Sequence, residues 1–186
     1  MNSARHDAMK GILWFGVDDA NTCVYVPVFN STLAAPHELA PGNGDMLTLS
    51  WDAMFWVNNY VANQAYNRYS QMIPDIRKVQ KGFEDSLTAS VDSLAATLTP
   101  AVSYADAQAT LAKLTDGSAA EVTKAYKNLG DYLFVKFMDG NIKRQNEDGS
   151  FKRTDEGIAV QPEFGGYNQR YFESIVKEKG DHFRID

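Results

Sequence analysis

Residues 12–30 read ILWFGVDDANTCVYVPVFN, and this stretch decides the fold. Two runs rich in β-branched and aromatic residues, 12–17 and 23–30, flank the turn-forming residues Asp18 to Asn21. Aspartate and asparagine favour turns because their side chains bond nearby backbone groups and tolerate left-handed conformations. The pattern therefore predicts a β-hairpin.

The first run of the hairpin is apolar without alternation. Ile12, Leu13, Trp14 and Phe15 are consecutive, so large side chains fall on both faces of the strand. Strands of this kind are usually covered on both sides, and an isolated two-stranded hairpin is only marginally stable in water. We expect the hairpin to belong to a larger sheet, although the rest of the chain offers few strands to pair with it.

Amphipathic helices are expected after a loop at 31–49 that is rich in proline and glycine. Ser50 is placed as the cap of the first helix, which should run to Met72. Pro74 predicts a kink or a restart of the helix. An apolar stripe with helical spacing then continues to Leu98 and indicates a long helix.

Two further helices are expected next. Ser103 with Asp106 is typical of a helix start, and Asp116–Gly117 of a helix end. The S-x-x-E pattern at 118–121 is a capping box and predicts another helix that runs up to Gly140. The helical part is then an antiparallel array, because each amphipathic helix must bury its apolar face against a neighbour.

The C-terminal part is expected to hold less regular structure. Asn146 to Gly149 has turn composition and suggests two very short strands on either side. Residues 169–179 predict a last short helix, with Gly180 as its stop signal.

Composition limits the classes of function. The 186 residues are 44% hydrophobic, which is enough for a folded core in one domain or in part of a larger one. The formal net charge is −6 and no basic run is present, so nucleic acid is not an expected partner. No window approaches the roughly 18 apolar residues of a membrane span.

A lone cysteine, Cys23, allows no intrachain disulfide and favours a reducing, cytoplasmic compartment, and residues 1–10 carry no recognisable secretion signal.

No catalytic constellation emerges from the nucleophiles and bases of the chain. The three histidines, His6, His37 and His182, lie in polar or terminal segments. Cys23 lies within an apolar strand, where a thiol is usually a small buried hydrophobe with an unreactive, protonated sulfur. Cys23 is therefore not expected to act as a nucleophile.

Other polar motifs favour structural roles. Asp18 and Asp19 should diverge, Asp148 lacks the ligand spacing of a calcium loop, and the glycine-rich motif at 42–45 has no lysine in register for phosphate. The run at 55–69, FWVNNYVANQAYNRY, is best explained as a helix packed on both sides. Its asparagines, Asn58, Asn59, Asn63 and Asn67, should bond to neighbouring backbone or line a cleft. Asn30, near the end of the second strand, is a weak cleft candidate. We assign no catalytic, cofactor-binding or metal residue and expect no cofactor.

Several segments together resemble one known family. These are WFGVDD at 14–19, YVPVF at 25–29, GNGD at 42–45, YSQMIPDIRKVQK at 69–81 and the tail KEKGDH at 177–182. They look like the C-terminal part of the dipeptidase A type of cysteine peptidases. The phrase Met72 to Arg77 is the most specific element. The similarity runs from about Gly11 to the end of this chain and would cover the last third or so of a full-length member.

The resemblance implies an N-terminal-nucleophile hydrolase with a four-layer αββα sandwich. In such enzymes a cysteine at the mature N-terminus attacks the peptide carbonyl, and its own α-amino group, with a reference pKa of roughly 7.7–8.0, serves as the base. The expected fold class is α+β: a hairpin from the sandwich, followed by a mainly antiparallel helical array, as an incomplete Ntn-hydrolase fold. Residues 1–10 are expected to be disordered or leader-like, and residues 11–186 to be the C-terminal portion of a dipeptidase domain. Within that portion we expect a hairpin at 11–30, a loop at 31–49, a helical part at 50–140, and a turn and C-terminal helix at 141–186.

The family's catalytic cysteine has no counterpart in this sequence, because residue 2 is Asn2 and Cys23 is internal. The resemblance thus predicts a C-terminal fragment of a dipeptidase that is inactive alone. Its partner would be the missing N-terminal part of the enzyme, with dipeptides as substrates only of the full-length protein. Two alternatives stay open, a non-catalytic binding or structural module and the second subunit of a split hydrolase, and a homo-oligomer is compatible with either.

Overall fold

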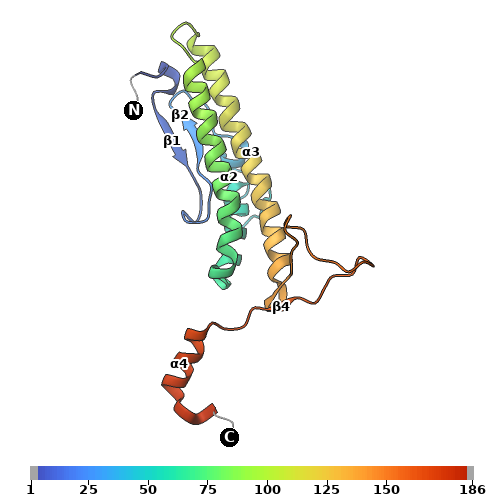
Figure 1. The fold of residues 1–186 in the computed structure, drawn as a ribbon. Coiled ribbons are helices and arrows are strands. Elements are labelled where there is room, and N and C mark those ends of the chain that lie inside the picture. The colour runs from blue at the N-terminus through green and yellow to red at the C-terminus, as the bar shows by residue number, and fades with distance from the viewer. Residues whose placement is uncertain (1–3, 184–186) are drawn as a thin grey trace. The chain divides into compact units, whose positions relative to one another are not determined.

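The computed structural model describes residues 4–183 and has an α+β fold (Figure 1). The chain divides into two compact units, one ending at Leu133 and one beginning at Phe134. In the first unit the elements follow the order η1 (Asp7–Met9), β1 (Ile12–Phe15), β2 (Val26–Phe29), η2 (His37–Leu39), α1 (Met54–Asn67), α2 (Tyr69–Thr97) and α3 (Tyr104–Phe137), whose last turn enters the second unit.

The predicted hairpin is confirmed. β1 and β2 pair antiparallel, with a register that runs from Ile12 opposite Phe29 to Phe15 opposite Val26. The connection between them, residues 16–25, is longer than a tight turn. Its tip contains Asp18 in the left-handed region, at φ 67°, as the turn-forming character of this residue allows.

The two strands differ in their burial. Val26, Pro27 and Phe29 of β2 are buried, whereas Leu13 is 59% exposed and Trp14 is 37% exposed. The expectation that both strands are covered on both faces is therefore wrong for β1. The physical reason is that the sheet has only these two strands in the described part of the chain, so β1 lacks a second neighbouring strand whose side chains would pack beside its own on either face.

Seven buried residues from four elements form a core at one end of the hairpin. They are Ala8, Met9, Phe29, Val91, Leu98, Ala107 and Leu111. The first two belong to η1, in the segment expected to be disordered or leader-like. There His6 accepts a hydrogen bond from the backbone N–H of Ala8 and bonds to the carbonyl of Val102 through its other ring nitrogen, at 3.1 Å each. These contacts hold η1 against the core.

The first helix break lies elsewhere than the sequence predicted. α1 begins after Ala53, without a side-chain cap, and Ser50 instead donates a hydrogen bond to Asn43 Oδ1 at 2.6 Å. The chain breaks at Arg68, at φ −148° and ψ 52°, and Pro74 lies inside α2. Pro74 is exposed and close to the start of α2, so its missing N–H costs that helix a single solvent-accessible bond.

The second predicted break is absent. Ser103 does cap α3, since its hydroxyl accepts from the N–H of Asp106 at 3.2 Å, but the helix then passes through Gly117 without interruption. A glycine inside a helix costs about 1 kcal/mol relative to alanine, which the buried face of α3 outweighs. Its buried residues up to Leu133 include Ala107, Leu111, Thr115, Ser118, Ala119, Val122, Thr123, Tyr126, Leu129 and Leu133.

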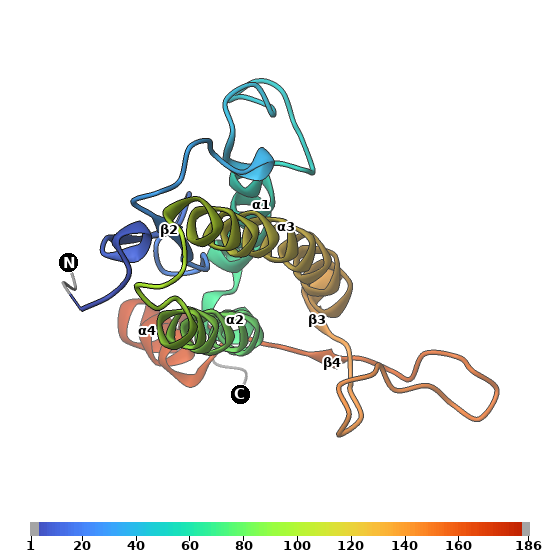
Figure 2. The ribbon, with the colours of Figure 1, turned by 90° about the horizontal axis from the view of Figure 1, so that it is seen from above.

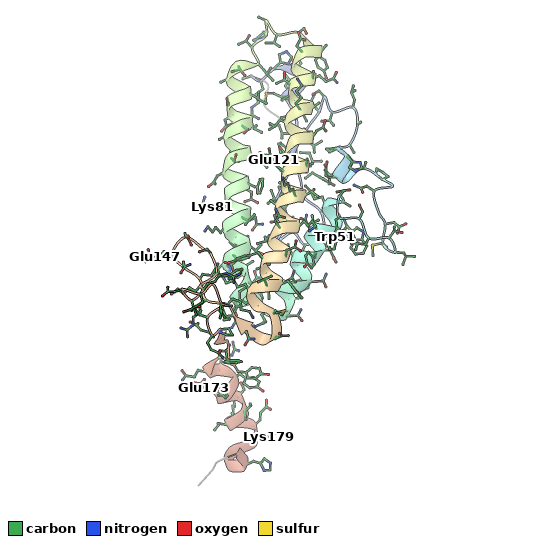
Figure 3. The ribbon with its side chains drawn as sticks, turned by 90° about the vertical axis from the view of Figure 1, so that its right-hand side faces the viewer. Trp51, Lys81, Glu121, Glu147, Glu173 and Lys179 are labelled. Carbon is green, nitrogen blue, oxygen red and sulfur yellow. The ribbon has the colours of Figure 1, made fainter. Side chains whose placement is uncertain are left out.

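α2 and the part of α3 up to Leu133 run side by side in opposite directions, as Figures 1 and 2 agree. The antiparallel packing expected for the helical part therefore holds for these two helices, although α3 takes the place of the two separate helices that the sequence suggested. Figure 3 shows the side chains along them, with Lys81 on α2, Glu121 on α3 and Trp51 on the loop that leads into α1. No helix within residues 4–183 combines the length and the apolar character that crossing a bilayer requires.

The second unit contains η3 (Met138–Gly140), β3 (Asn141–Ile142), β4 (Glu163–Phe164), α4 (Gln169–Lys179) and η4 (Gly180–Phe183). The predicted turn is confirmed by a 3.0 Å bond from Gly149 N to the carbonyl of Asn146. The predicted last helix is also confirmed. Asn168 caps its start, and Gly180 ends it at φ 56°.

Gly130 of α3 is a point of close packing and gives the first prediction. A Cβ at this position would lie 2.3 Å from the ring of Tyr60, whereas a Cβ at Gly117 of the same helix would meet nothing within 4 Å. We expect Gly130→Ala to lower the free energy of unfolding by about 1–3 kcal/mol, because the ring of Tyr60 must move. Gly117→Ala should raise it by up to about 1 kcal/mol through helix propensity alone.

Urea unfolding of the two variants, followed by circular dichroism, checks this difference. Equal effects of the two substitutions would contradict the packing of Tyr60 on α3.

Candidate functional site

Polar side chains from all three helices of the first unit converge on the hairpin connection, residues 16–25. We call this set the tip cluster. Its members are Asp18, Asp19, Asn21, Thr22, Cys23, Asn58, Asn59, Tyr66, Tyr69, Arg77, Gln80 and Tyr126. The cluster joins two segments that carry the family resemblance, residues 14–19 and 69–81. It is a dense constellation of hydrogen-bonded residues and therefore the first candidate for a site.

The contribution of α2 is a chain of hydrogen bonds from Arg77. Its guanidinium donates to Asn21 Oδ1 at 2.5 Å and to Gln80 Oε1 at 2.9 Å. Gln80 is buried and donates to the carbonyls of Cys23 at 2.6 Å and Asn21 at 3.3 Å. The amide of Asn21 donates to the hydroxyl of Tyr69 at 2.6 Å. These bonds orient Gln80 toward backbone carbonyls of the hairpin connection.

The contribution of α1 comes from its asparagine-rich face. Asn58 is buried and donates to the carbonyl of Val17, and Asn59 donates to Asp18 Oδ1, at 3.1 Å each. Tyr66 donates to Asp19 Oδ2 at 3.1 Å, and this hydrogen bond raises the pKa of Tyr66. The prediction that the asparagines bond neighbouring backbone is confirmed for Asn58. It also holds for the two others, Asn63 and Asn67, which bond carbonyls one turn earlier in α1.

The contribution of α3 is a buried tyrosine. Tyr126 is fully buried, and its hydroxyl donates to the carbonyl of Thr22 at 2.6 Å. Burial raises the pKa of Tyr126 well above its ordinary value, so the side chain stays neutral and keeps its proton for this bond. The sequence identified Tyr126 only as part of an apolar face, because helical periodicity registers the ring and not the hydroxyl.

Cys23 lies at the centre of the tip cluster but is a packing residue. It is 1% exposed, and burial raises the pKa of its thiol. A Cβ at Gly16 would lie 2.7 Å from Cys23 Sγ, so the glycine of the WFGVDD segment leaves the space that the sulfur fills. A buried thiol with a raised pKa carries little thiolate at neutral pH. The arrangement agrees with the buried, protonated thiol expected from the sequence.

The remaining motifs weighed in the sequence also serve the fold. Asn30 accepts from Gly11 N and donates to the carbonyl of Asp7, at 3.0 Å each, so its amide fixes the end of the hairpin. In the glycine-rich loop, the carbonyl of Asp45 accepts from Trp56 Nε1 at 3.1 Å. Within residues 4–183, no three or more histidine, cysteine, aspartate or glutamate side chains gather where they could hold a metal ion.

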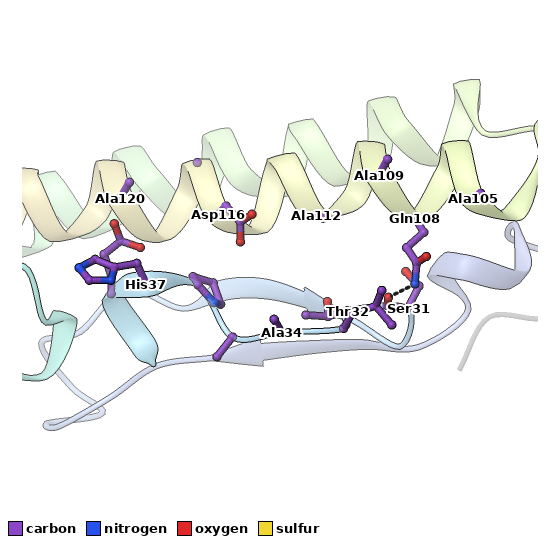
Figure 4. Close-up of a pocket in the computed structure, with 15 residues that line it drawn as sticks. Ser31, Thr32, Ala34, His37, Ala105, Gln108, Ala109, Ala112, Asp116 and Ala120 are labelled. Carbon is purple, nitrogen blue, oxygen red and sulfur yellow. Dashed lines mark hydrogen bonds between the residues drawn. The ribbon is translucent and has the colours of Figure 1, made fainter. Parts of the chain in front are cut away.

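A groove of about 750 Å³ separates the loop after β2 from α3 (Figure 4). Gln108 of α3 crosses one end of it and donates to the carbonyl of Ser31 at 2.6 Å. Alanines dominate the helical wall, namely Ala105, Ala109, Ala112 and Ala120. The ionisable residues that line the groove are His37, Glu38 and Asp116. Among the described residues, no hydrogen bond joins these three side chains to one another, so the groove is not the first candidate for a site.

The tip cluster therefore positions the hairpin connection. Donors on the three helices bond the carbonyls of the hairpin connection and its aspartate and asparagine side chains. Cys23, which lies in the same connection, is buried. The sequence assigned no functional residue here and missed the roles of Arg77 and Gln80. A signal was available, since Gln80 is a polar residue on the same side of α2 as the buried Ile76 and Leu87.

Burial of Cys23 gives the second prediction. In the native chain at neutral pH, alkylation by iodoacetamide should be more than about tenfold slower than in the urea-unfolded chain, because modification requires opening of the core. Mass spectrometry of quenched samples measures both rates. Fast and complete alkylation of the native protein would contradict the buried position of the thiol.

The anchoring role of Gln80 gives the third prediction. Gln80→Met keeps the size of the side chain but leaves the carbonyl of Cys23 without its donor, so the free energy of unfolding should fall by about 1–3 kcal/mol. The matched control is Lys78→Met, an exposed position on the same helix, where the change should stay within about 0.5 kcal/mol. Urea titration of both variants checks the contrast, and equal small effects would refute the anchor.

Residues 1–82 match the model of peptidase family C69. The match includes the hairpin, the loop, α1 and the first half of α2, and with them the phrase Met72 to Arg77. It stops before the tail at 177–182. No significant match was found among curated proteins or among solved structures. Over its first 82 residues, which build most of the tip cluster, this chain is similar to peptidase family C69.

Proposed function

We propose that this chain is the part of a cysteine-type dipeptidase that supports the catalytic layer and does not carry the nucleophile. The match over residues 1–82 supports a peptidase-type function. The narrower proposal, a dipeptidase of the N-terminal-nucleophile type, rests on the resemblance of the hairpin and of residues 69–81 to that family. In this proposal, dipeptides are substrates of the assembled protein, and the partner of the chain is the nucleophile-bearing part of the enzyme.

The observation that carries the proposal is the state of Cys23. A cysteine peptidase needs a thiolate that substrate can reach. Cys23 is the only cysteine of the chain, it is 1% exposed, and its pKa is raised. The cysteine chemistry of the family must then come from a residue outside this sequence.

The tip cluster fits a supporting role. Hydrogen bonds from α1, α2 and α3 fix the connection of the hairpin without using any group for catalysis. Catalytic groups must be held within a fraction of an ångström by surrounding structure, and a hairpin tied to three helices is a rigid element of the kind this requires.

The proposal gives the fourth prediction. The purified full chain should release no amino acids from a panel of unblocked dipeptides at neutral pH, and Cys23→Ala should behave identically. Co-expression with a cysteine-initiated polypeptide encoded directly upstream should yield a complex that hydrolyses dipeptides. That activity should survive Cys23→Ala and disappear after alkylation of the partner's first residue.

Two outcomes would contradict this proposal. Hydrolysis by the chain alone that Cys23→Ala abolishes would overturn the assignment of the nucleophile. A complex that forms but never hydrolyses dipeptides would favour a non-catalytic structural module.

A further inference from the structure

The outer edge of β1 carries unpaired backbone groups, and the ladder shows which ones. In an antiparallel pair, residues alternate between those that bond the partner strand and those that point away from it. Asn30 N donates to the carbonyl of Gly11 at 3.0 Å, so Gly11 belongs to the bonding set. By alternation Leu13 and Phe15 also bond β2. Ile12 and Trp14 therefore turn their N–H and C=O groups outward.

β2 confirms this alternation from the other side. Phe29, opposite Ile12, donates its N–H to Thr32 Oγ1 at 3.2 Å and accepts from Thr32 N at 3.0 Å, both away from β1. Pro27, opposite Trp14, has no N–H, and its carbonyl accepts from Thr115 Oγ1 of α3 at 2.9 Å. The outer edge of β2 is thus closed by a proline, a loop and a helix.

The edge of β1 has none of these protections. Natural edge strands are usually blunted by charges, prolines, bulges or a covering element. β1 reads ILWF, without a charge or a proline, and pairs with β2 in an unbroken register. Leu13 is 59% exposed, and Trp14 and Phe15 are 37% exposed each. The strand combines a free row of donors and acceptors with exposed apolar side chains.

The sequence of β1 is self-complementary about Leu13. When a second copy is placed antiparallel along the edge, with Leu13 opposite Leu13 of the other copy, Ile12 of each chain faces Trp14 of the other. The residues with outward groups then meet each other, which gives four backbone hydrogen bonds with the geometry of narrow antiparallel pairs. β1 has no charged side chain that would face a like charge in the second copy. Apolar side chains of one copy lie beside apolar side chains of the other on both faces of the sheet.

From this we infer that two copies of the chain pair through the outer edges of β1, in the order β2–β1–β1–β2, to form a continuous four-stranded sheet. The interface is isologous, because the same edge serves on both copies. It is independent of the proposed function, since it uses neither the tip cluster nor a nucleophile.

The test uses charge at the two-fold axis and is the fifth prediction. Leu13→Lys should be monomeric in sedimentation equilibrium at about 100 μM, where even a small interface is populated, because it sets two ammonium groups directly opposite each other. The wild-type chain should be dimeric. The matched control is Leu33→Lys, at a position that is 87% exposed and outside β1, and it should remain dimeric.

A mixing experiment makes the test specific for the register. Leu13→Lys and Leu13→Glu should each be monomeric, and an equimolar mixture should form a heterodimer at low salt, since the opposed charges now attract. Circular dichroism should show that both variants are folded, because Leu13 is largely exposed in the single chain.

Hydrogen exchange resolves the edge by residue. The amides of Ile12 and Trp14 should exchange at least about tenfold more slowly in the wild-type dimer than in Leu13→Lys, whereas the amides of Leu13 and Phe15, which bond β2, should be protected in both. A monomeric wild-type chain, a Leu13→Lys variant that is still dimeric, or equal exchange of Ile12 and Trp14 in both proteins would overturn the inference. A monomeric wild type leaves the dipeptidase proposal untouched, which stands or falls with the hydrolysis assay.

Discussion

The carbonyl groups of the hairpin connection impose the constraint on which the first unit depends. Residues 16–25 lie outside the ladder of β1 and β2, so their buried carbonyls lack strand partners. A buried polar group without a partner is costly. Three helices supply the donors: Asn58 of α1 to Val17, Gln80 of α2 to Cys23, and Tyr126 of α3 to Thr22. Satisfying these carbonyls fixes where each helix lies against the hairpin.

The local features of this arrangement could be predicted from sequence. The hairpin follows from two β-rich runs around a turn segment, and the last helix from the composition of residues 169–179 and its closing glycine, because each of these signals acts over a few residues. The limits of the long helices, in contrast, were not predicted correctly from the sequence. Asp116–Gly117 and the S-x-x-E pattern indicate a break, yet α3 is continuous, since burial along its full length exceeds the local preference of a few residues.

The tip cluster could not be predicted from the sequence, because its contacts also depend on the whole fold and not on local patterns. Gln80, Arg77 and Tyr126 are separated from the connection by more than fifty residues, and only the fold brings them to it. Nothing in the local pattern around Gln80 states which carbonyl it will meet. The burial of Cys23, in contrast, was predicted correctly, although Cys23 lies in the hairpin connection and not within the second strand as the sequence suggested. The raised pKa of the thiol is a direct result of that burial.

The two strands of the hairpin differ in burial and in the protection of their outer edges. β2 is sealed by Thr32, Thr115 and its own proline and belongs to the core. β1 presents its edge and its apolar side chains outward. The same hairpin therefore has one strand buried in the core and one strand at an open edge of the two-stranded sheet.

A double-mutant cycle on the two central anchors tests this account most directly. Gln80→Met and Tyr126→Phe each free one of two adjacent carbonyls, those of Cys23 and Thr22. If the helices hold the connection as one unit, the loss of unfolding free energy in the double variant should fall short of the sum of the single losses by about 1 kcal/mol, because either change loosens the same segment. Strictly additive losses would contradict the account and show that the helices and the hairpin connection are stabilised independently.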